Sequence, residues 1–379
     1  MNNTSTERSI KDYPYYQVIS FLTVYPAIVA IGLIGNALII CIMPRTKVQI
    51  CRSTKLYYLI IAIADMANLI NSWVIWTFLD ESLYLLTNGK FNLPLAKSGN
   101  IQCKAIYTIW VITEDVSNYT EIALAIERII AITIPLKSKY FLGMKFSLFL
   151  ILICTIPPIL FTVPLTFLVV GITNAPGLAI TNSICEKDAS HPLIQEYTIL
   201  LIIFTYLLHE LIGLIVVLVL SYKLIKIART RLGSTRNLEL HSSRPEHLIL
   251  SREFGSSLVI FILTLINFAV FLPTSLLEWI YFYADVEQFG GLAICILDSI
   301  CIAHSLNFFV YYFRIPSFKQ AISLEGPKLG RFRTLRLSSR ISNKYLRSRS
   351  STSNPRIQSN VNLTPHSVNS RCISFADPV

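Results

Sequence analysis

The stretch FSLFLILICTIPPILFTVPLTFLVV, residues Phe146–Val170, runs for 25 residues without a single charged side chain. An apolar helix of about 18–20 residues is long enough to cross the roughly 30 Å hydrocarbon core of a bilayer. Such a helix also satisfies its own backbone hydrogen-bonding groups, which water cannot reach at that depth. The stretch therefore predicts a transmembrane helix.

Six further apolar blocks lie along the chain, and the third block in chain order is the most polar. They predict transmembrane helices near Val18–Met43, Leu56–Leu79, Cys103–Ile134, Leu193–Leu224, Leu258–Phe282 and Leu292–Phe313. The composition agrees, because 53% of the 379 residues are hydrophobic and only 15% are charged, whereas soluble domains carry about 25% charged residues. Eight cysteines are too few for a disulfide-rich secreted module. We therefore expect an all-α membrane protein with a seven-transmembrane helix bundle.

Lysine and arginine side chains mark one side of this bundle. Of the 33 lysines and arginines, 26 lie in the polar segments on the side of the C-terminus and only six lie on the other side. Positive residues are enriched on the cytoplasmic side of membrane proteins, so we expect an extracellular N-terminus and a cytoplasmic C-terminus. Asn2 and Asn3 each begin an Asn-x-Ser/Thr sequon on the outer side and are candidate glycosylation sites.

The blocks divide the chain into four parts. We expect an extracellular tail over residues 1–17, a helix bundle over 18–313, a short amphipathic cytoplasmic helix over 314–322 and a disordered tail over 323–379. Arg229–Glu246 is also predicted to be a polar loop. We interpret the basic tail as a charged segment near anionic membrane lipids and not as a nucleic-acid site. No nucleophile–base pair, metal spacing or phosphate loop stands out, so neither an enzyme nor a cofactor is expected.

Polar residues recur inside the apolar blocks, where they are costly and mark functional sites. They are Asn36 after Gly35, Asp65, the pair Glu127-Arg128 before Ile129, and Asn307 in the ending Asn307-Phe308-Phe309-Val310-Tyr311. The sixth block adds the apolar segment Phe268–Pro273. In this order, and from about Ser20 to Ala321, the chain resembles the rhodopsin-like (class A) G-protein-coupled receptors. Within that family it is most similar to the peptide-receptor group.

The chain departs from the family pattern at several motif positions. Glu127 and Ile129 replace the Asp and Tyr of the Asp-Arg-Tyr motif. Phe271 stands in place of the toggle Trp two residues before Pro273, and Phe308 replaces the Pro of Asn-Pro-x-x-Tyr. These departures concern the activation switch and not the fold.

The resemblance implies several groups of site residues. Cys103 and Cys185 are expected to form a disulfide. The residues implied for G-protein coupling and switching are Glu127, Arg128, Glu253, Phe271, Pro273, Asn307 and Tyr311. A hydrated polar cluster, which in the family can hold a sodium ion at the aspartate, is implied for Asn36, Asp65, His304 and Asn307. The alternatives are an Arg128 that only reaches the interface and a polar cluster without an ion.

The ligand side is expected to be acidic. Tyr107, Trp110 and Glu114 follow Cys103 by four, seven and eleven residues, which predicts an inward-facing helical stripe. In the family an Asp at the position of Trp110 binds amines, so the resemblance disfavours an aminergic receptor. Carboxylates favour a cationic ligand, and the expected ligand-binding residues are Tyr107, Trp110, Glu114, Glu278, Tyr281 and Asp298. The alternative is that Glu114 or Asp298 pairs within the bundle.

The resemblance as a whole implies a plasma-membrane receptor for an extracellular ligand. The expected ligand is a cationic or amidated neuropeptide, and the expected partners are a heterotrimeric G protein, arrestin and receptor kinases. A light-sensing opsin is disfavoured, because Leu292–Phe313 contains no Lys for a retinal Schiff base. Two alternatives stay open: a seven-helix transporter or channel, and a receptor of the same fold for a lipid or small molecule.

Overall fold

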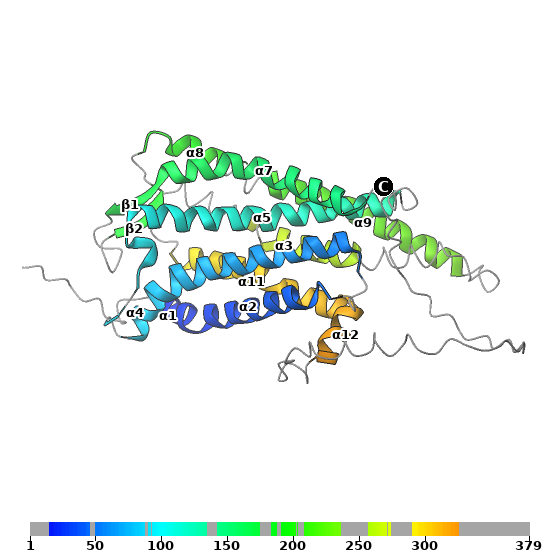
Figure 1. The fold of residues 1–379 in the computed structure, drawn as a ribbon, viewed down its shortest axis with the longest axis horizontal. Helices are drawn as coiled ribbons and strands as arrows, with labels where there is room; N and C mark the ends of the chain where they lie inside the picture. The colour runs from blue at the N-terminus through cyan, green and yellow to red at the C-terminus, as the bar shows by residue number, and fades with distance from the viewer. Residues whose placement is uncertain are drawn as a thin grey trace, which may run out of the picture. The chain divides into compact units, whose positions relative to one another are not determined.

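Long helices and a β-hairpin make up the described part of the chain (Figure 1). The computed structural model describes residues 15–45, 50–87, 90–91, 93–134, 142–174, 183–187, 191–201, 203, 208–235, 257–270, 272–273 and 290–325. Several residues expected at functional sites lie outside these ranges: Asn2, Asn3, Glu253, Phe271, Glu278 and Tyr281. The helix bundle and the hairpin lie in the compact unit that ends at Ala321.

The first two expected spans are helices with π-helical segments inside them. The first runs through α1 (Tyr15–Ile19), η2 (Ser20–Val24) and α2 (Tyr25–Ile42). The second runs through α3 (Arg52–Leu69), η3 (Ile70–Ser82) and α4 (Leu83–Leu86). Both begin before the apolar blocks that predicted them. A helix does not have to begin where hydropathy rises, because residues such as Arg52 and Lys55 are themselves good helix formers.

The remaining helices follow the order of the apolar blocks. Their bounds are η4 (Leu95–Lys97), α5 (Asn100–Thr133), α7 (Met144–Val169), α8 (Ile194–Leu201), α9 (His209–Thr235), the apolar helix Ser257–Val270, α11 (Gly290–Arg314) and α12 (Pro316–Glu325). Within the described ranges, Ser20–Ile42, Arg52–Trp76 and Met144–Val169 are long and apolar enough to span a membrane. The polar α5 does not meet that standard, in line with the polar character of the third block.

Two sequence-based boundaries were wrong. Arg229–Thr235 continues α9 and is not a loop, since Lys and Arg side chains favour a helix even where the hydropathy signal has ended. The short helix covers Pro316–Glu325 and not 314–322. Helix α11 runs through Arg314, and Pro316 suits the first position of a new helix because its missing N–H would have no partner there.

The hairpin lies at the end of the bundle where α5 begins. Strands β1 (Val170–Asn174) and β2 (Ser183–Lys187) pair antiparallel, with Val170 opposite Lys187 and Ile172 opposite Cys185. The sequence indicated only a loop after the fourth span. The hairpin follows α7 directly, and α12 lies at the other end of the bundle (Figure 1).

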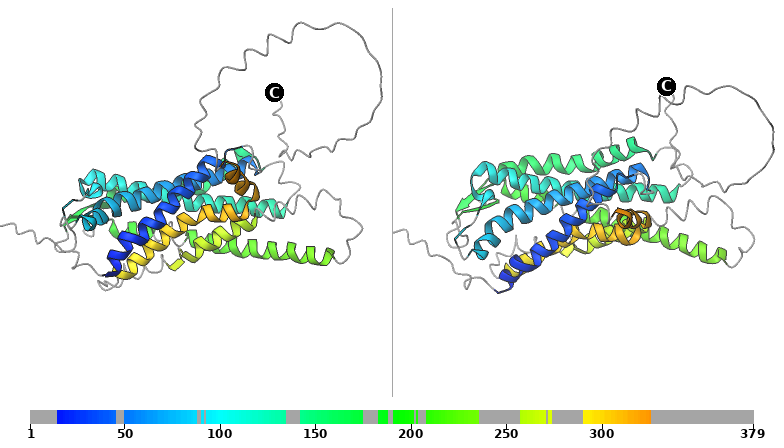
Figure 2. Two further views of the ribbon diagram at one scale, coloured as in Figure 1. Left: turned by 90° about the horizontal axis from the view of Figure 1, so that it is seen from below. Right: turned by 60° about the horizontal axis from the view of Figure 1, so that its bottom comes forward.

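Helix α5 occupies the middle of the described bundle. It contacts α3, α7 and α9, whereas α2 contacts α3 and α11. Figure 2 shows the long helices running alongside one another. Gly32 and Gly35 allow α2 to approach α11, because a Cβ at Gly32 would collide with Ser305 and one at Gly35 would lie 2.7 Å from Phe308 Cβ. Small residues of this kind are what bring helix backbones together in membranes.

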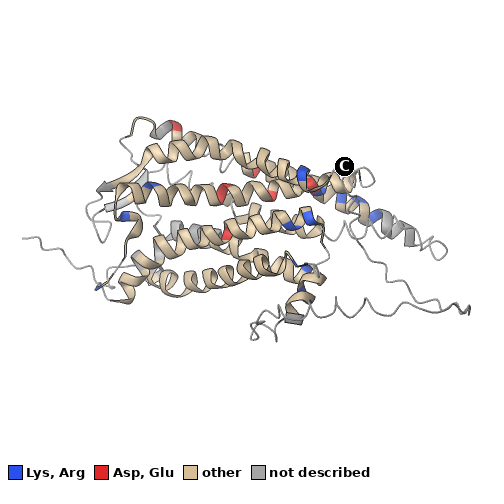
Figure 3. Cartoon of the chain, viewed as in Figure 1, with Lys and Arg blue, Asp and Glu red and all other residues tan. Residues whose placement is uncertain are grey.

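The bundle exposes large apolar side chains and buries carboxylates, in addition to an apolar core. Large apolar side chains of α7, such as Phe149, Ile153 and Leu160, are about half exposed or more. Carboxylates are buried, among them Asp65, Asp115 and Glu127, each 0% exposed. Figure 3 shows most of the described acidic residues within the helices, with basic residues gathered towards the helix ends. This pattern fits a protein whose outer surface faces lipid.

Candidate functional site

The hairpin end of the bundle is closed by a disulfide between Cys103 of α5 and Cys185 of β2. This is the disulfide that the resemblance implied. Both cysteines are buried and pack with Ala96 and Val170. The bond therefore holds the hairpin against the first turn of α5, and we call this end of the bundle the disulfide end.

An aromatic row lies next to the disulfide. The Tyr107 ring meets the Trp76 and Trp110 rings edge-on, with centroids 6.0 and 5.2 Å apart respectively. Glu114 is further along α5 and is 3% exposed. Asn71 of η3 donates a 2.9 Å hydrogen bond to the Ile106 carbonyl and thereby holds Trp76 of the same helix beside α5. Asp298 lies in α11, but its side chain is outside what the structure describes.

A second carboxylate on α5, Asp115, is also completely buried. Its Oδ2 atom accepts a 3.0 Å hydrogen bond from the Thr162 hydroxyl of α7. Asp115 therefore connects α5 to α7, a role for which the sequence carried no signal.

A fully buried polar cluster surrounds Asp65 of α3. Its Oδ1 atom accepts a 2.5 Å hydrogen bond from the Ser117 hydroxyl and lies 2.8 Å from His304 Nδ1. Its Oδ2 atom accepts a 2.5 Å hydrogen bond from Asn307 Nδ2. Asn36 of α2 donates to the His304 carbonyl at 3.1 Å. The cluster brings together the four residues expected there and adds Ser117, so that it joins α2, α3, α5 and α11.

The pair Glu127–Arg128 lies at the opposite end of α5, which we call the Arg128 end. Arg128 NH2 is 2.5 Å from Glu127 Oε1 and donates to the Thr54 hydroxyl at 2.8 Å. The Ser147 hydroxyl of α7 donates to Glu127 Oε2 at 2.7 Å, and Ser53 lies 3.5 Å from Glu127 Oε1. Arg128 is only 5% exposed. The pair is thus held closed by hydroxyl groups from two neighbouring helices.

Tyr311, near the end of α11, is packed and not exposed. Its ring centroid lies 4.4 Å from that of Tyr58 on α3, and Phe318 of α12 meets it edge-on at 6.5 Å. Phe308, which stands in place of the family's Pro, contacts the Phe318 ring as well. The ending of the seventh block therefore forms an aromatic contact between α3, α11 and α12.

Pro273, another residue expected at the switch, is exposed.

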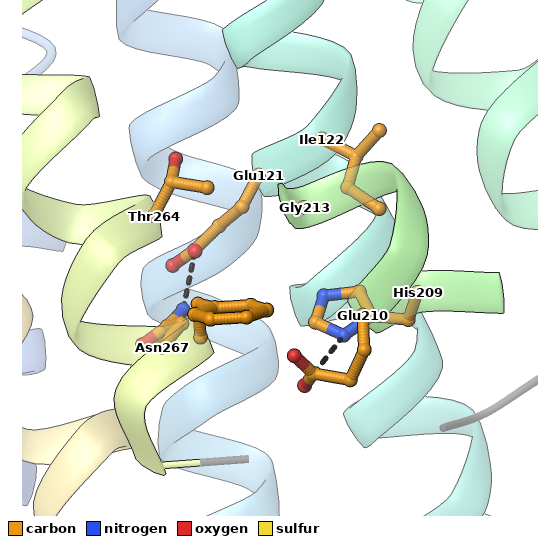
Figure 4. A pocket seen from close by; sticks show the side chains of 8 residues that line it. Glu121, Ile122, His209, Glu210, Gly213, Thr264 and Asn267 are labelled. Atoms are coloured by element: carbon orange, nitrogen blue, oxygen red, sulfur yellow. Dashed lines mark hydrogen bonds and ion pairs between the residues drawn. The ribbon is translucent and has the colours of Figure 1, made fainter. Parts of the chain in front are cut away.

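A small polar pocket lies between α5, α9 and the helix Ser257–Val270 (Figure 4). Asn267 Nδ2 donates to Glu121 Oε2, and His209 Nδ1 lies 3.5 Å from Glu210 Oε1. The pocket has room for about one water molecule, which is too little for an organic ligand. Among the described side chains, no group of three or more His, Cys, Asp and Glu is arranged to hold a metal ion.

Comparison with known proteins decides the family. Residues 35–311 match the description "7 transmembrane receptor (rhodopsin family)". The chain belongs to this family of receptors. No match is found among curated proteins. Family membership makes the receptor a non-enzymatic, multi-pass membrane protein with a seven-helix bundle, which signals to a heterotrimeric G protein as class A receptors do.

The sodium ion that the family implies beside the aspartate does not fit the donors found in this receptor. Ser117, His304 and Asn307 already engage both oxygens of Asp65. An ionised carboxylate only accepts hydrogen bonds, so beside an ionised Asp65 the His304 Nδ1 atom is the donor in this contact. A donor N–H points at the oxygen that a cation would need as a ligand.

Sequence reasoning missed the hydroxyl groups that complete these sites. Ser53, Thr54 and Ser147 surround the Glu127–Arg128 pair, and Ser117 binds Asp65. Serine and threonine inside helices commonly bond to their own backbone, as Thr155 does to the Ile151 carbonyl. Their presence in an apolar block therefore gives no signal about a partner on another helix.

Proposed function

We propose that the receptor binds a cationic extracellular ligand, of the class of basic or amidated neuropeptides, at the disulfide end of the bundle. The receptor would then lie in the plasma membrane, with its Arg128 end facing the cytoplasm. The distribution of lysine and arginine supports this orientation, with 26 of 33 on the side of the C-terminus. In this orientation residues 1–17 form an extracellular tail and residues 323–379 form a basic cytoplasmic tail.

The observation that carries the ligand class is the aromatic row beside Glu114. Trp76, Tyr107 and Trp110 form a row of ring contacts at the disulfide end, and Glu114 follows Trp110 by one helical turn. Aromatic faces attract cations, and a carboxylate binds an arginine side chain through two parallel hydrogen bonds. A ligand with a guanidinium or ammonium group suits both features.

The proposed switch is the closed Glu127–Arg128 pair. In the structure Arg128 is buried and bonded to Glu127 and Thr54, so a G protein could not reach it. A ligand shifts the balance between two helix packings only by binding one of them more tightly. We propose that the ligand favours the packing in which this pair opens and Arg128 becomes accessible.

A peptide library screened on expressing cells tests the ligand class, with calcium and cyclic AMP read together. Glu114→Gln is then measured against the active peptide at matched surface expression. Truncating one member of a partly desolvated charge pair costs about 2–5 kcal/mol, so potency is expected to fall by roughly 30-fold or more. Glu196→Gln on α8 is the control, because this acidic side chain is exposed. A neutral active ligand, or an equal effect of both variants, would contradict the proposal.

A further inference from the structure

We propose that His304 takes the place of the sodium ion at Asp65, so that the packing of this receptor is independent of sodium. The inference concerns the centre of the bundle and does not depend on which ligand the receptor binds. It rests on three observations: the burial of Asp65, the donors on its two oxygens, and the close packing that holds α11 in position.

Asp65 has no access to water in the structure. Its side chain is 0% exposed, and that of His304 is 4% exposed. A carboxylate at this depth needs partners, because an isolated buried charge is unfavourable by several kcal/mol. In a site of this kind the partners can be a bound cation with its oxygen ligands or hydrogen-bond donors from the chain itself.

The chain supplies its own donors from two helices. The Ser117 hydroxyl on α5 and His304 Nδ1 on α11 both contact Oδ1, at 2.5 and 2.8 Å. Asn307 Nδ2 contacts Oδ2 at 2.5 Å. A carboxylate has about four acceptor positions, so three of them are taken by side chains. A cation on Oδ1 would have to displace the His304 ring.

The backbone of α11 at His304 is held by the packing of α11 against α2. Asn36 donates to the His304 carbonyl at 3.1 Å, which fixes the backbone of α11 at this residue. The next residue, Ser305, donates a 3.2 Å hydrogen bond to the Ile28 carbonyl of α2. Gly32 of α2 faces Ser305 so closely that an added Cβ would collide with it. His304 therefore cannot leave Asp65 by a small shift of α11 towards α2.

An imidazole ring offers the carboxylate one hydrogen-bond donor where the ion would offer a full positive charge. Its Nδ1–H directs a positive dipole at Oδ1, and a protonated ring would form an ion pair with the carboxylate at the same 2.8 Å distance. The side chain is covalently attached, so its local concentration does not vary with the salt outside the cell. The expected consequence is a receptor whose inactive packing is equally stable with and without sodium.

The test measures the thermal unfolding temperature of the purified full-length receptor in lipid nanodiscs, without ligand. Sodium chloride is exchanged for choline chloride at constant ionic strength, so that general salt effects cancel. A ligand that binds the folded state raises the unfolding temperature by mass action, by roughly 2–4 °C for each tenfold rise above its dissociation constant. We expect no sodium-dependent shift for the wild type.

Four variants locate the effect: His304→Ser, two double variants built on it, and Asp65→Asn alone. His304→Ser opens the site, and its unfolding temperature is expected to rise with sodium by that increment. Adding Asp65→Asn to that variant should remove the rise, whereas adding Glu196→Gln should leave it, since Glu196 is exposed on α8. A sodium response of the wild type that Asp65→Asn abolishes would overturn the proposal. So would a His304→Ser variant that folds and shows no response. If His304→Ser does not fold, the wild type and Asp65→Asn still decide the matter.

Discussion

Ser147 contributes a hydroxyl group to the closed Glu127–Arg128 pair. It donates to Glu127 Oε2 at 2.7 Å, and its own backbone carbonyl accepts a hydrogen bond from Tyr57 at 3.3 Å. Ser147 is 0% exposed, as is Glu127. Removing the hydroxyl leaves a buried carboxylate oxygen without this donor, which costs about 1–3 kcal/mol. That cost weakens the packing in which the pair is closed.

Ser147→Ala is therefore expected to raise ligand-free nucleotide exchange on the G protein, by about fivefold or more if the lost hydrogen bond acts only in the closed state. The measurement is the exchange rate in membranes at matched receptor density. Thr155→Val is the control, because Thr155 is on the same helix and its hydroxyl donates to the Ile151 carbonyl of that helix. Equal rates for the wild type and Ser147→Ala would show that the hydroxyl does not hold the switch.

At the scale of helices, the contact between α2 and α11 depends on glycine. Gly32 lies against Ser305 and Leu69, whereas a Cβ added at Gly213, inside α9, would have no atom within 4 Å. Adding a methyl group to a close-packed contact typically costs about 1–3 kcal/mol. In an open helix interior, Ala is better than Gly by about 1 kcal/mol. A Gly→Ala substitution is thus expected to lower the stability of the receptor at position 32 and to raise it slightly at position 213.

Gly32→Ala should lower the unfolding temperature of the purified receptor, and Gly213→Ala should leave it unchanged or raise it. Expression at the cell surface is a second measurement, since a receptor whose helices pack poorly is retained inside the cell. A Gly32→Ala receptor as stable as the wild type would mean that Ser305 can move aside and that the close approach does not fix α11 against α2.

The hairpin is tied to α5 through one covalent bond. Breaking a native disulfide typically removes about 2–4 kcal/mol of stability. Cys103→Ser and Cys185→Ser are each expected to lower the surface expression of the receptor or its binding of ligand. The double variant should be no worse than either single one, because both changes remove the same bond. Effects that add would indicate that the two thiols act separately.

At the scale of the whole molecule, the two ends of α5 carry different functions in the proposed mechanism. The aromatic row and Glu114 lie towards the disulfide end, and Arg128 lies 25 residues after Cys103 on the same helix. At 1.5 Å per residue this is about 37 Å, which is more than the roughly 30 Å hydrocarbon core of a bilayer. Signal transfer across that distance must proceed through a change in helix packing and not through direct contact between ligand and G protein.

Arg128→Ala is expected to abolish nucleotide exchange on the G protein while ligand binding at the other end survives. Radioligand binding and exchange are measured on the same membranes. Arg52→Ala is a matched control, because Arg52 is exposed at the start of α3. Normal exchange by the Arg128 variant would remove this residue from the proposed coupling surface.

Local properties of the sequence were enough for the membrane class and the number of spans, whereas the family and the disulfide were expected from the resemblance. The cost of placing a residue in lipid depends on that residue and its near neighbours. A block such as Phe146–Val170 can therefore be recognised as a transmembrane helix from its own residues. The same approach failed at helix ends. Arg229–Thr235 is helical and the short helix ends at Glu325, because backbone hydrogen bonding continues after hydropathy has fallen.

Only the tertiary structure decided which partners the buried polar residues find. Asp65 and His304 are 239 residues apart, and Ser147 is 20 residues from Glu127 on a different helix. Whether such side chains meet depends on the rotation and spacing of whole helices, which close contacts such as Gly32 against Ser305 set. The sequence by itself determined that polar residues lie inside the membrane. The packing determined that four side-chain hydroxyls, those of Ser53, Thr54, Ser117 and Ser147, complete their sites.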